Sequence, residues 1–173
     1  YPGGEAALQR ELDTLLARMN KEMSTYDKSS LISRFNQGPA RMPMMIPATM
    51  ATIVQQGIDT GHLSQGKLDV TVGPLVNLWG FGPDMRPLKK PSDAQIAKAR
   101  QIVGIDKLTL TPQGDHFLLS KTIPDLYLDL STLGEGAASD EIAVLLESKG
   151  VHNYLIEVAG AVRSKGNNSK GKP

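Results

Sequence analysis

Residues 66–82 constrain what this chain can fold into more than any other stretch. Their sequence, GKLDVTVGPLVNLWGFG, holds four glycines, one proline and the only tryptophan of the 173 residues. Glycine adopts positive φ angles and lets other groups approach the backbone closely. A packing segment does not need this mixture, which is typical of a surface where backbone and one aromatic ring meet a flat, phosphate-bearing ligand.

A second informative stretch, residues 126–136, joins a predicted strand to a predicted helix. Asp129 lies near the end of the strand at 126–130, and Ser131 and Thr132 begin the helix, with Glu135 as the capping-box partner of Thr132. Free N–H groups and the helix dipole make such a junction an anion site. Two interpretations stay open. Asp129 and Glu135 either accept hydrogen bonds from a ligand or belong to a capped helix with an acidic first turn.

The remaining pattern predicts a layered α+β or α/β domain. Predicted helices run from near Glu5 to about Met23, from Ser29 or Ser30 to Phe35, over 49–60, from after the N-cap Ser92 to a stop at Gly104, and from 131 to about 149. Predicted strands cover 107–111, 116–120, 126–130 and 153–158, with loops at 37–47 and 84–91 and a mobile tail at 164–173.

Composition excludes several classes of function. The absence of cysteine rules out disulfides, zinc–thiolate sites and thiol catalysis. A net charge of +1 and 5% aromatic residues argue against a nucleic-acid partner. No apolar run approaches the roughly 18–20 residues of a membrane span. The sequence has no Walker loop and no G-x-S-x-G elbow, and its histidines lack metal-ligand spacing.

Several other side chains fit either a ligand site or the core. Asp69, within apolar and small residues, is either an ordinary strand-edge carboxylate or one held by a specific donor. Trp79 and Phe81 either form a wall of an aromatic-ligand pocket or anchor the core under a glycine-rich turn. Tyr26 and Asn36 belong to a polar group after the first helix, whose alternative role is to cap and anchor a loop.

Taken together, these segments resemble the ApbE family of FAD:protein FMN transferases. The matching segments occur in family order and cover nearly the whole chain: 23–27 (MSTYD), 31–36 (LISRFN), 66–82, 125–136 and 153–158 (NYLIEV). The string DVTVGPLVNLWGFG is highly specific for the family. The resemblance implies an α+β fold with a mixed sheet and packed helices. It makes residues 1–173 the amino-terminal portion of such a domain, incomplete relative to the full family fold.

The resemblance also implies an activity. The family uses Mg2+, cleaves the pyrophosphate of FAD, links FMN through a phosphoester to a threonine of a target protein and releases AMP. By position, the family's FAD contacts match Tyr26, Lys67, Leu68, Asp69, Asp129 and Glu135, with Asn77 and Trp79 as further cofactor-binding candidates. Thr132 matches a residue of the Mg2+ site.

The partners and location implied by the resemblance follow from the same family. The targets are flavin-carrying subunits of sodium-pumping quinone reductases and of Rnf-type complexes. The location is the periplasm, with lipoprotein anchoring through a segment not present in this sequence. The catalytic residues, a histidine and the Asp and Thr that complete the metal site, are expected beyond Pro173.

Differences from the family pattern keep other interpretations open. Ala137 stands where members usually carry an aromatic residue, and Ala159 where they usually have the first glycine of a pair. The chain is therefore expected to be part of a transferase that is inefficient alone, or a degenerate module that binds FAD or its ADP half. The third alternative is a fragment that folds through self-association. An exposed apolar face or sheet edge predicts homo-oligomers or segment exchange.

Overall fold

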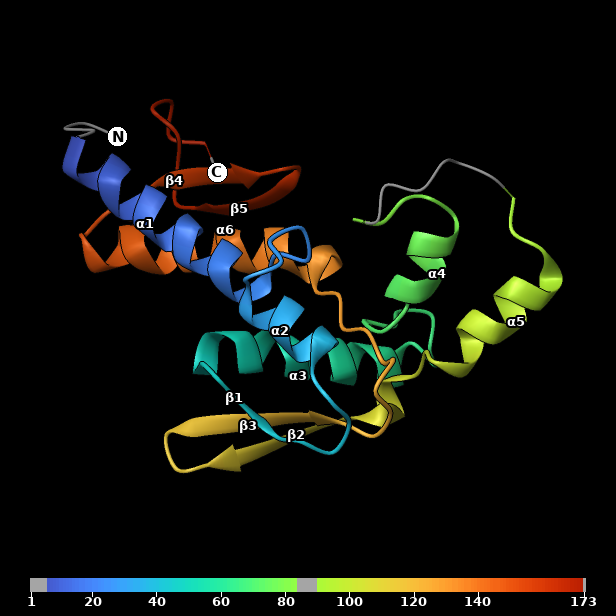
Figure 1. Ribbon diagram of the computed structural model, residues 1–173. Helices are drawn as coiled ribbons and strands as arrows, with labels where there is room; N and C mark the ends of the chain where they lie inside the picture. Colours follow the sequence, from blue (N-terminus) through green and yellow to red (C-terminus); the bar gives the residue numbers. More distant parts are fainter. Residues whose placement is uncertain (1–5, 84–89, 173) are drawn as a thin grey trace. The chain divides into compact units, whose positions relative to one another are not determined.

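The computed structural model describes residues 6–83 and 90–172, which form two compact units. The central unit is Lys21–Thr132, and the terminal unit joins Tyr1–Asn20 to Leu133–Pro173. Both contain helices and a small antiparallel sheet, as Figure 1 shows, so the predicted α+β class is confirmed. Within the described ranges, no helix is both long enough and apolar enough to span a membrane.

The elements follow one another along the chain in this order: α1 Ala6–Met23, α2 Leu31–Gln37, β1 Met44–Ile46, α3 Ala48–Leu63, α4 Gly73–Leu78, α5 Asp93–Gln101, the 3-10 turn η1 Ile105–Lys107, β2 Leu108–Gln113, β3 His116–Lys121, α6 Ser131–Ser148, β4 Tyr154–Val158 and β5 Ala161–Lys165.

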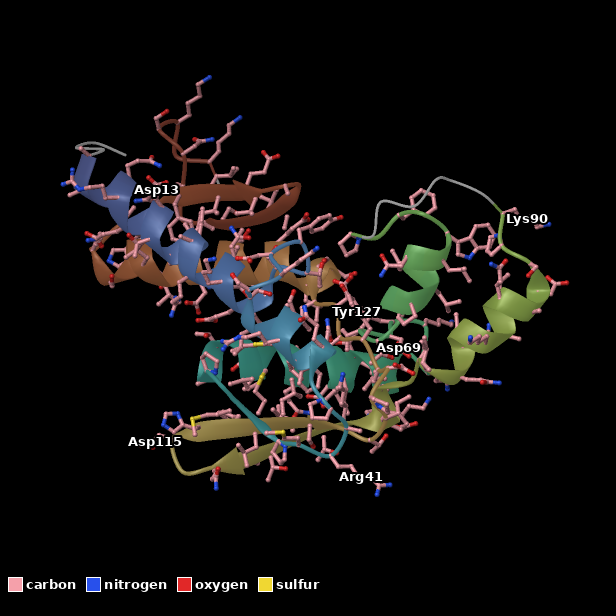
Figure 2. The ribbon with its side chains drawn as sticks, viewed as in Figure 1. Asp13, Arg41, Asp69, Lys90, Asp115 and Tyr127 are labelled. Atoms are coloured by element: carbon pink, nitrogen blue, oxygen red, sulfur yellow. The ribbon has the colours of Figure 1, made fainter. Side chains whose placement is uncertain are left out.

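The core of the central unit lies between helices and a three-stranded sheet of order β1-β3-β2. Both pairings are antiparallel, and Leu119 of β3 lies opposite Met44 of β1 and Leu110 of β2. Helix α3 packs on this sheet (Figure 1) and buries Met50 and Val54 completely. Asp115 marks the tip of the β2–β3 turn (Figure 2). Burial of apolar side chains between α3 and the sheet therefore stabilises the core of the central unit.

The extended segment 126–130 belongs to no sheet, so the strand predicted there is wrong. The leucines at 126, 128 and 130 are all at most 1% exposed, which satisfies the alternation that suggested a strand. The carboxamide of Asn36 takes the place of a neighbouring strand. Its Nδ2 donates to the Leu128 carbonyl at 2.9 Å, and its Oδ1 accepts from the Leu128 N–H at 2.8 Å.

A buried lysine reinforces this arrangement. Lys121 is 2% exposed, and its Nζ donates to the carbonyls of Asn36 and Pro124 at 2.7 Å and of Leu126 at 3.2 Å. The ammonium also lies 5.4 Å from the centre of the Phe35 ring. These carbonyls satisfy the three donors of the charged group, as burial of an ammonium requires. One side chain thereby connects β3, α2 and the segment that leads to Asp129.

The terminal unit contains α6 from Leu133 onwards, the β4–β5 hairpin and α1 up to Asn20. Glu157 of β4 lies opposite Val162 of β5. Ion pairs join Arg18 to Glu141 at 2.9 Å and Lys149 to Glu11 at 2.8 Å. The apolar core consists of Ile142, Ala143 and Ile156, packed with Leu12, Leu15, Leu16, Leu146, Tyr154 and Val158.

Several predicted boundaries differ from the structure. The helix predicted from Ser29 or Ser30 to Phe35 begins at Leu31 and ends at Gln37, with Ser30 as its N-cap, because the Ser30 hydroxyl accepts from the Ser33 N–H at 3.1 Å. β1 falls inside the predicted loop 37–47, and α3 extends to Leu63. Residues 66–72 precede α4 without forming a strand, so Asp69 is not a strand-edge residue.

Other differences concern the later elements. The N-cap role of Ser92 is confirmed by a complete capping box, but α5 ends at Gln101, before the predicted stop at Gly104. β5, absent from the prediction, contains Ser164 and Lys165, which the sequence analysis placed in the tail. The capping box proposed for Thr132 is also wrong, because Thr132 lies inside α6. Of the predicted loop 84–91, residues 84–89 lie outside the described residues.

Candidate functional site

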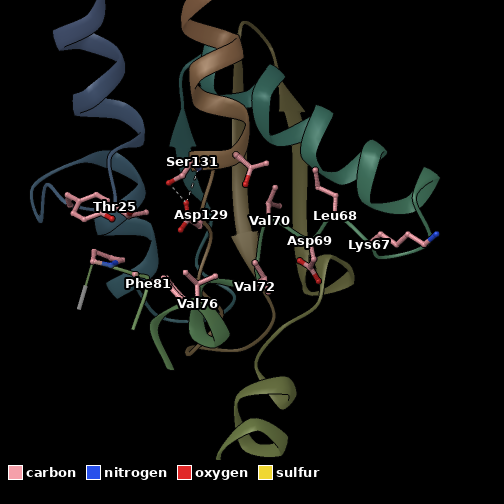
Figure 3. A pocket seen from close by; sticks show the side chains of 14 residues that line it. Thr25, Lys67, Leu68, Asp69, Val70, Val72, Val76, Phe81, Asp129 and Ser131 are labelled. Carbon is pink, nitrogen blue, oxygen red and sulfur yellow. Dashed lines mark hydrogen bonds between the residues drawn. The ribbon is translucent and has the colours of Figure 1, made fainter. Parts of the chain in front are cut away.

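The central unit contains a cavity of about 360 Å³ at the start of α6 (Figure 3). It is bounded by residues 67–72 after α3, by α4 and the turn that follows it to residue 83, and by residues 129–132. Thr25 and Tyr26 close another side. This volume lies within the range of about 300–1,000 Å³ typical of small-molecule sites.

Two carboxylates of the cavity are held by the same local turn. Asp69 Oδ1 accepts from the Thr71 N–H at 2.7 Å and from its hydroxyl at 2.6 Å. Asp129 Oδ1 accepts from the Ser131 N–H at 2.9 Å and from its hydroxyl at 2.6 Å, drawn as dashed lines in Figure 3. The Asp129 N–H donates to the Val70 carbonyl at 2.7 Å, which fastens one turn to the other.

This double turn leaves one oxygen of each carboxylate available. No hydrogen bond from a described residue reaches the second oxygen of Asp69 or of Asp129. An ionised carboxylate accepts about four hydrogen bonds, so each side chain has unused acceptor capacity. The pair can therefore receive hydrogen bonds from ligand N–H or O–H groups, which is the ligand-binding interpretation left open for Asp129.

The cavity also has features that favour an anion. Ser131 and Thr132 form the first turn of α6, an 18-residue helix whose N-terminal dipole end carries partial positive charge. Lys67 adds an exposed cation on the loop after α3. In Figure 3 its side chain extends outward, away from Asp129. A ligand with both anionic and hydrogen-bond-donor groups matches this mixed lining.

Apolar and aromatic groups complete the lining. Val70 is 3% exposed and forms part of the base, whereas Phe81 and Tyr26 are 70% and 68% exposed. Exposed rings at the edge of a cavity present their faces to a planar ligand without a large loss of side-chain freedom. Of Trp79 and Phe81, the two aromatic residues considered for a pocket wall, Phe81 lines the cavity together with Tyr26, and Trp79 does not.

The structure brings most of the predicted site residues together. Tyr26, Lys67, Leu68, Asp69, Asp129 and Thr132 all line the cavity. Asn77 does not. It is 8% exposed and borders a second cavity of about 800 Å³ formed with α5 and residues 124–127. Trp79 is the C-cap of α4, outside the lining. Glu135 is exposed and belongs to the part of α6 that lies in the terminal unit.

Two glycines of the segment 66–82 are explained by protein packing. A side chain at Gly73 would collide with the ring of Tyr127, labelled in Figure 2. A side chain at Gly82 would collide with the carboxamide and Cα of Asn77. The close approaches that the glycine-rich composition predicted therefore exist, but at these two positions the approaching group is part of the protein.

Sequence reasoning missed three hydroxyl residues in or beside the cavity. Ser131 and Thr71 could have been recognised from the repeated Asp-x-Ser/Thr pattern at 69–71 and 129–131, which favours this turn. Thr25 has no such signal. It is 8% exposed, and its buried hydroxyl has no hydrogen-bond partner among the residues that the structure describes. The next carboxylate along the chain, Asp27, has its pKa lowered to about 2 by hydrogen bonds from Lys21 and Ser29.

The described residues do not by themselves make a magnesium site. Across 6–83 and 90–172 there is no group of three His, Cys, Asp or Glu residues that could hold a metal ion. Thr132 contributes one hydroxyl, whereas Mg2+ takes six oxygen ligands in octahedral geometry. Waters and substrate phosphates usually supply some of these oxygens, but they require a carboxylate anchor beside them.

The fold and the cavity are those of a small-molecule-binding domain, and sequence comparison defines its family. The sequence pattern of the ApbE family matches residues 1–173, and the chain belongs to this family. It is 47% identical over 166 residues to the FAD:protein FMN transferase of Vibrio cholerae serotype O1, covering 96% of this chain and 48% of that protein. It is 42% identical over 168 residues to the FAD:protein FMN transferase of Escherichia coli K12, covering 97% and 48%.

Solved structures agree with the family assignment. The flavin transferase ApbE from Vibrio cholerae superposes with a TM-score of 0.91 at 46% identity, over 100% of this chain and 55% of that one. The apo flavinyl transferase ApbE of Pseudomonas stutzeri gives a TM-score of 0.87 at 34% identity, over 96% and 54%. The chain spans about half the length of the curated relatives it matches.

Proposed function

We propose that this chain provides the flavin-nucleotide site of an FAD:protein FMN transferase. The reaction moves FMN from FAD to a threonine hydroxyl of a target flavoprotein subunit and releases AMP. The main support is one observation: six residues that match the family's FAD and metal contacts line a single cavity of the central unit. Relatives 42–47% identical to this chain carry the name of this activity.

The lining suggests how each group acts on the nucleotide. Asp69 and Asp129 accept hydrogen bonds from ligand N–H or O–H groups through their unused oxygens. The first turn of α6 and Lys67 favour the diphosphate charge. Tyr26 and Phe81 present aromatic faces to a planar ring. A cavity of about 360 Å³ suits one part of FAD, so the rest of the molecule extends past the edge of the cavity.

Transfer requires more than binding. A bond forms between the threonine oxygen and the FMN phosphorus, the bond from that phosphorus to the AMP oxygen breaks, and the hydroxyl proton passes to a base. We assign no residue of this chain as that base. We propose that the base and the remaining metal ligands belong to the part of the relatives that this chain does not match, so that the chain alone binds FAD without transferring FMN.

We include Mg2+ dependence in the proposal, with Thr132 as one ligand. Thr132 would contribute one oxygen to such a metal, and Mg2+, when bound, would supply charge neutralisation at the phosphate oxygens. The resemblance also supports periplasmic location and target subunits of sodium-pumping quinone reductases or Rnf-type complexes. If the lone chain forms oligomers, the Leu155 and Val162 side chains, 71% and 60% exposed, are the contact we expect in the terminal unit.

A chimera tests the proposal. The chain replaces the matching 166 residues of the Vibrio cholerae transferase, and FMN addition to a target subunit is followed by mass spectrometry in the presence of FAD and Mg2+. We expect the chimera to add one FMN and release AMP, and its Asp69→Ala variant to be much slower. A chimera that binds FAD without transfer would favour the alternative, a nucleotide-binding module. A chimera that neither binds nor transfers would refute both.

A further inference from the structure

Thr71 connects a carboxylate of the cavity to a distant turn. Its side chain is completely buried, and its hydroxyl donates to Asp69 Oδ1 at 2.6 Å. The same hydroxyl oxygen accepts from the Gly104 N–H at 2.6 Å. One oxygen atom thus makes two short hydrogen bonds, one to Asp69 two residues earlier and one to Gly104, 33 residues further along the sequence.

The connection fixes the Asp69 side chain. Two donors of Thr71, N–H and hydroxyl, hold the same carboxylate oxygen, which restricts rotation about the side-chain bonds of Asp69. Gly104 in turn has a φ of 140°, a conformation suited to glycine, directly before η1. The Val70 carbonyl is also held, by the Asp129 N–H. The loop that carries Asp69 is therefore anchored at two successive residues.

We propose, on the basis of the proposed function, that Thr71 is a positioning residue that preorganises Asp69 for the flavin nucleotide. Without its hydroxyl, only the backbone N–H of residue 71 holds the carboxylate, which then samples more orientations that binding must restrict. Ordering one such side chain costs enough free energy to weaken binding about 3- to 10-fold. Thr71 itself does not line the cavity, so it acts on the ligand only through Asp69.

A double-mutant cycle on the 173-residue chain tests this role. FAD affinity is measured by flavin fluorescence for the wild type, Thr71→Val, Asp69→Ala and the double variant. Circular dichroism and thermal unfolding establish that each protein is folded at the assay temperature. Valine has nearly the shape of threonine, and Asp69→Ala removes the group through which Thr71 is proposed to act.

We expect Thr71→Val to weaken FAD binding about 3- to 10-fold in the wild-type background and less than about twofold in the Asp69→Ala background. Thr71→Ser keeps the hydroxyl and should restore affinity to within about twofold of wild type. An equal weakening in both backgrounds, or a serine variant as weak as the valine variant, would show that Thr71 only supports the fold. A wild-type chain that does not bind FAD would overturn the proposed function together with this inference.

Discussion

Substitution of Lys121 tests how the segment 126–130 is held in place. Replacing it with methionine keeps most of the length and the apolar stem but removes the ammonium. Three carbonyls, those of Asn36, Pro124 and Leu126, then lose the hydrogen bonds that they accept from the buried ammonium. The substitution otherwise leaves the volume of the buried side chain nearly unchanged.

The expected loss follows from these three contacts. Each hydrogen bond from a charged donor contributes about 1.5 kcal/mol or more, so three contribute roughly 4–5 kcal/mol. Removing a buried charge relieves its desolvation, which also lowers the pKa of Lys121, and this offsets about 1–2 kcal/mol. We therefore expect Lys121→Met to reduce the free energy of unfolding by about 3 kcal/mol, equivalent to a Tm lower by roughly 6–12 °C.

Urea and thermal unfolding measure the effect. Lys28→Met is the matched control, since Lys28 is exposed in the same unit, and we expect it to change stability by less than about 0.5 kcal/mol. A Lys121→Met variant as stable as the control would show that the buried ammonium contributes no net stability, and the account of this segment would be wrong.

Two further substitutions test the surroundings of Tyr26. Thr25→Val replaces a buried hydroxyl that has no partner within 6–83 and 90–172, so we expect equal or higher stability in urea, by up to about 1 kcal/mol. A clear loss of stability would mean that the hydroxyl is hydrogen-bonded. For Asp27, a carboxyl NMR titration of the wild type should give a midpoint near pH 2. Because this pKa lies below its ordinary 3.8, Asp27 stabilises the fold above that value and the contribution disappears as pH falls through about 2. Lys21→Met should raise the midpoint towards 3.8 while the Ser29 donors keep it lower, and an unchanged midpoint would exclude Lys21 as the main cause.

Elements fixed by local pattern were predictable from the sequence. The periodic apolar residues of α1, the capping residue Ser92 and the hairpin of β2 and β3 each depend on neighbours within a few residues. The segment 126–130 shows the limit of such reasoning. Alternating leucines correctly indicate an extended, buried chain. Its partner, however, is the side chain of Asn36, 92 residues away in sequence, which no local pattern reveals.

Some features of the candidate site were likewise predictable from the sequence and others were not. Family resemblance identified the loops that form the cavity, because their motifs are specific. It did not distinguish Trp79 from Phe81, since both are aromatic residues of one glycine-rich string. The turn at Gly80, with a φ of 87°, separates them, and only Phe81 reaches the cavity. Asn77 lies outside the lining for a related reason: its carboxamide packs against Gly82, a contact that composition alone does not predict.

The central claim is that the cavity between residues 67–72 and 129–132 binds a flavin nucleotide. Hydrogen–deuterium exchange of the chain with and without FAD tests it most directly. The account predicts slower exchange on FAD addition at 67–72 and 129–132, and little change in the β2–β3 hairpin, whose tip at Asp115 is outside the cavity lining. Protection confined to other segments, or no protection at saturating FAD, would contradict the account.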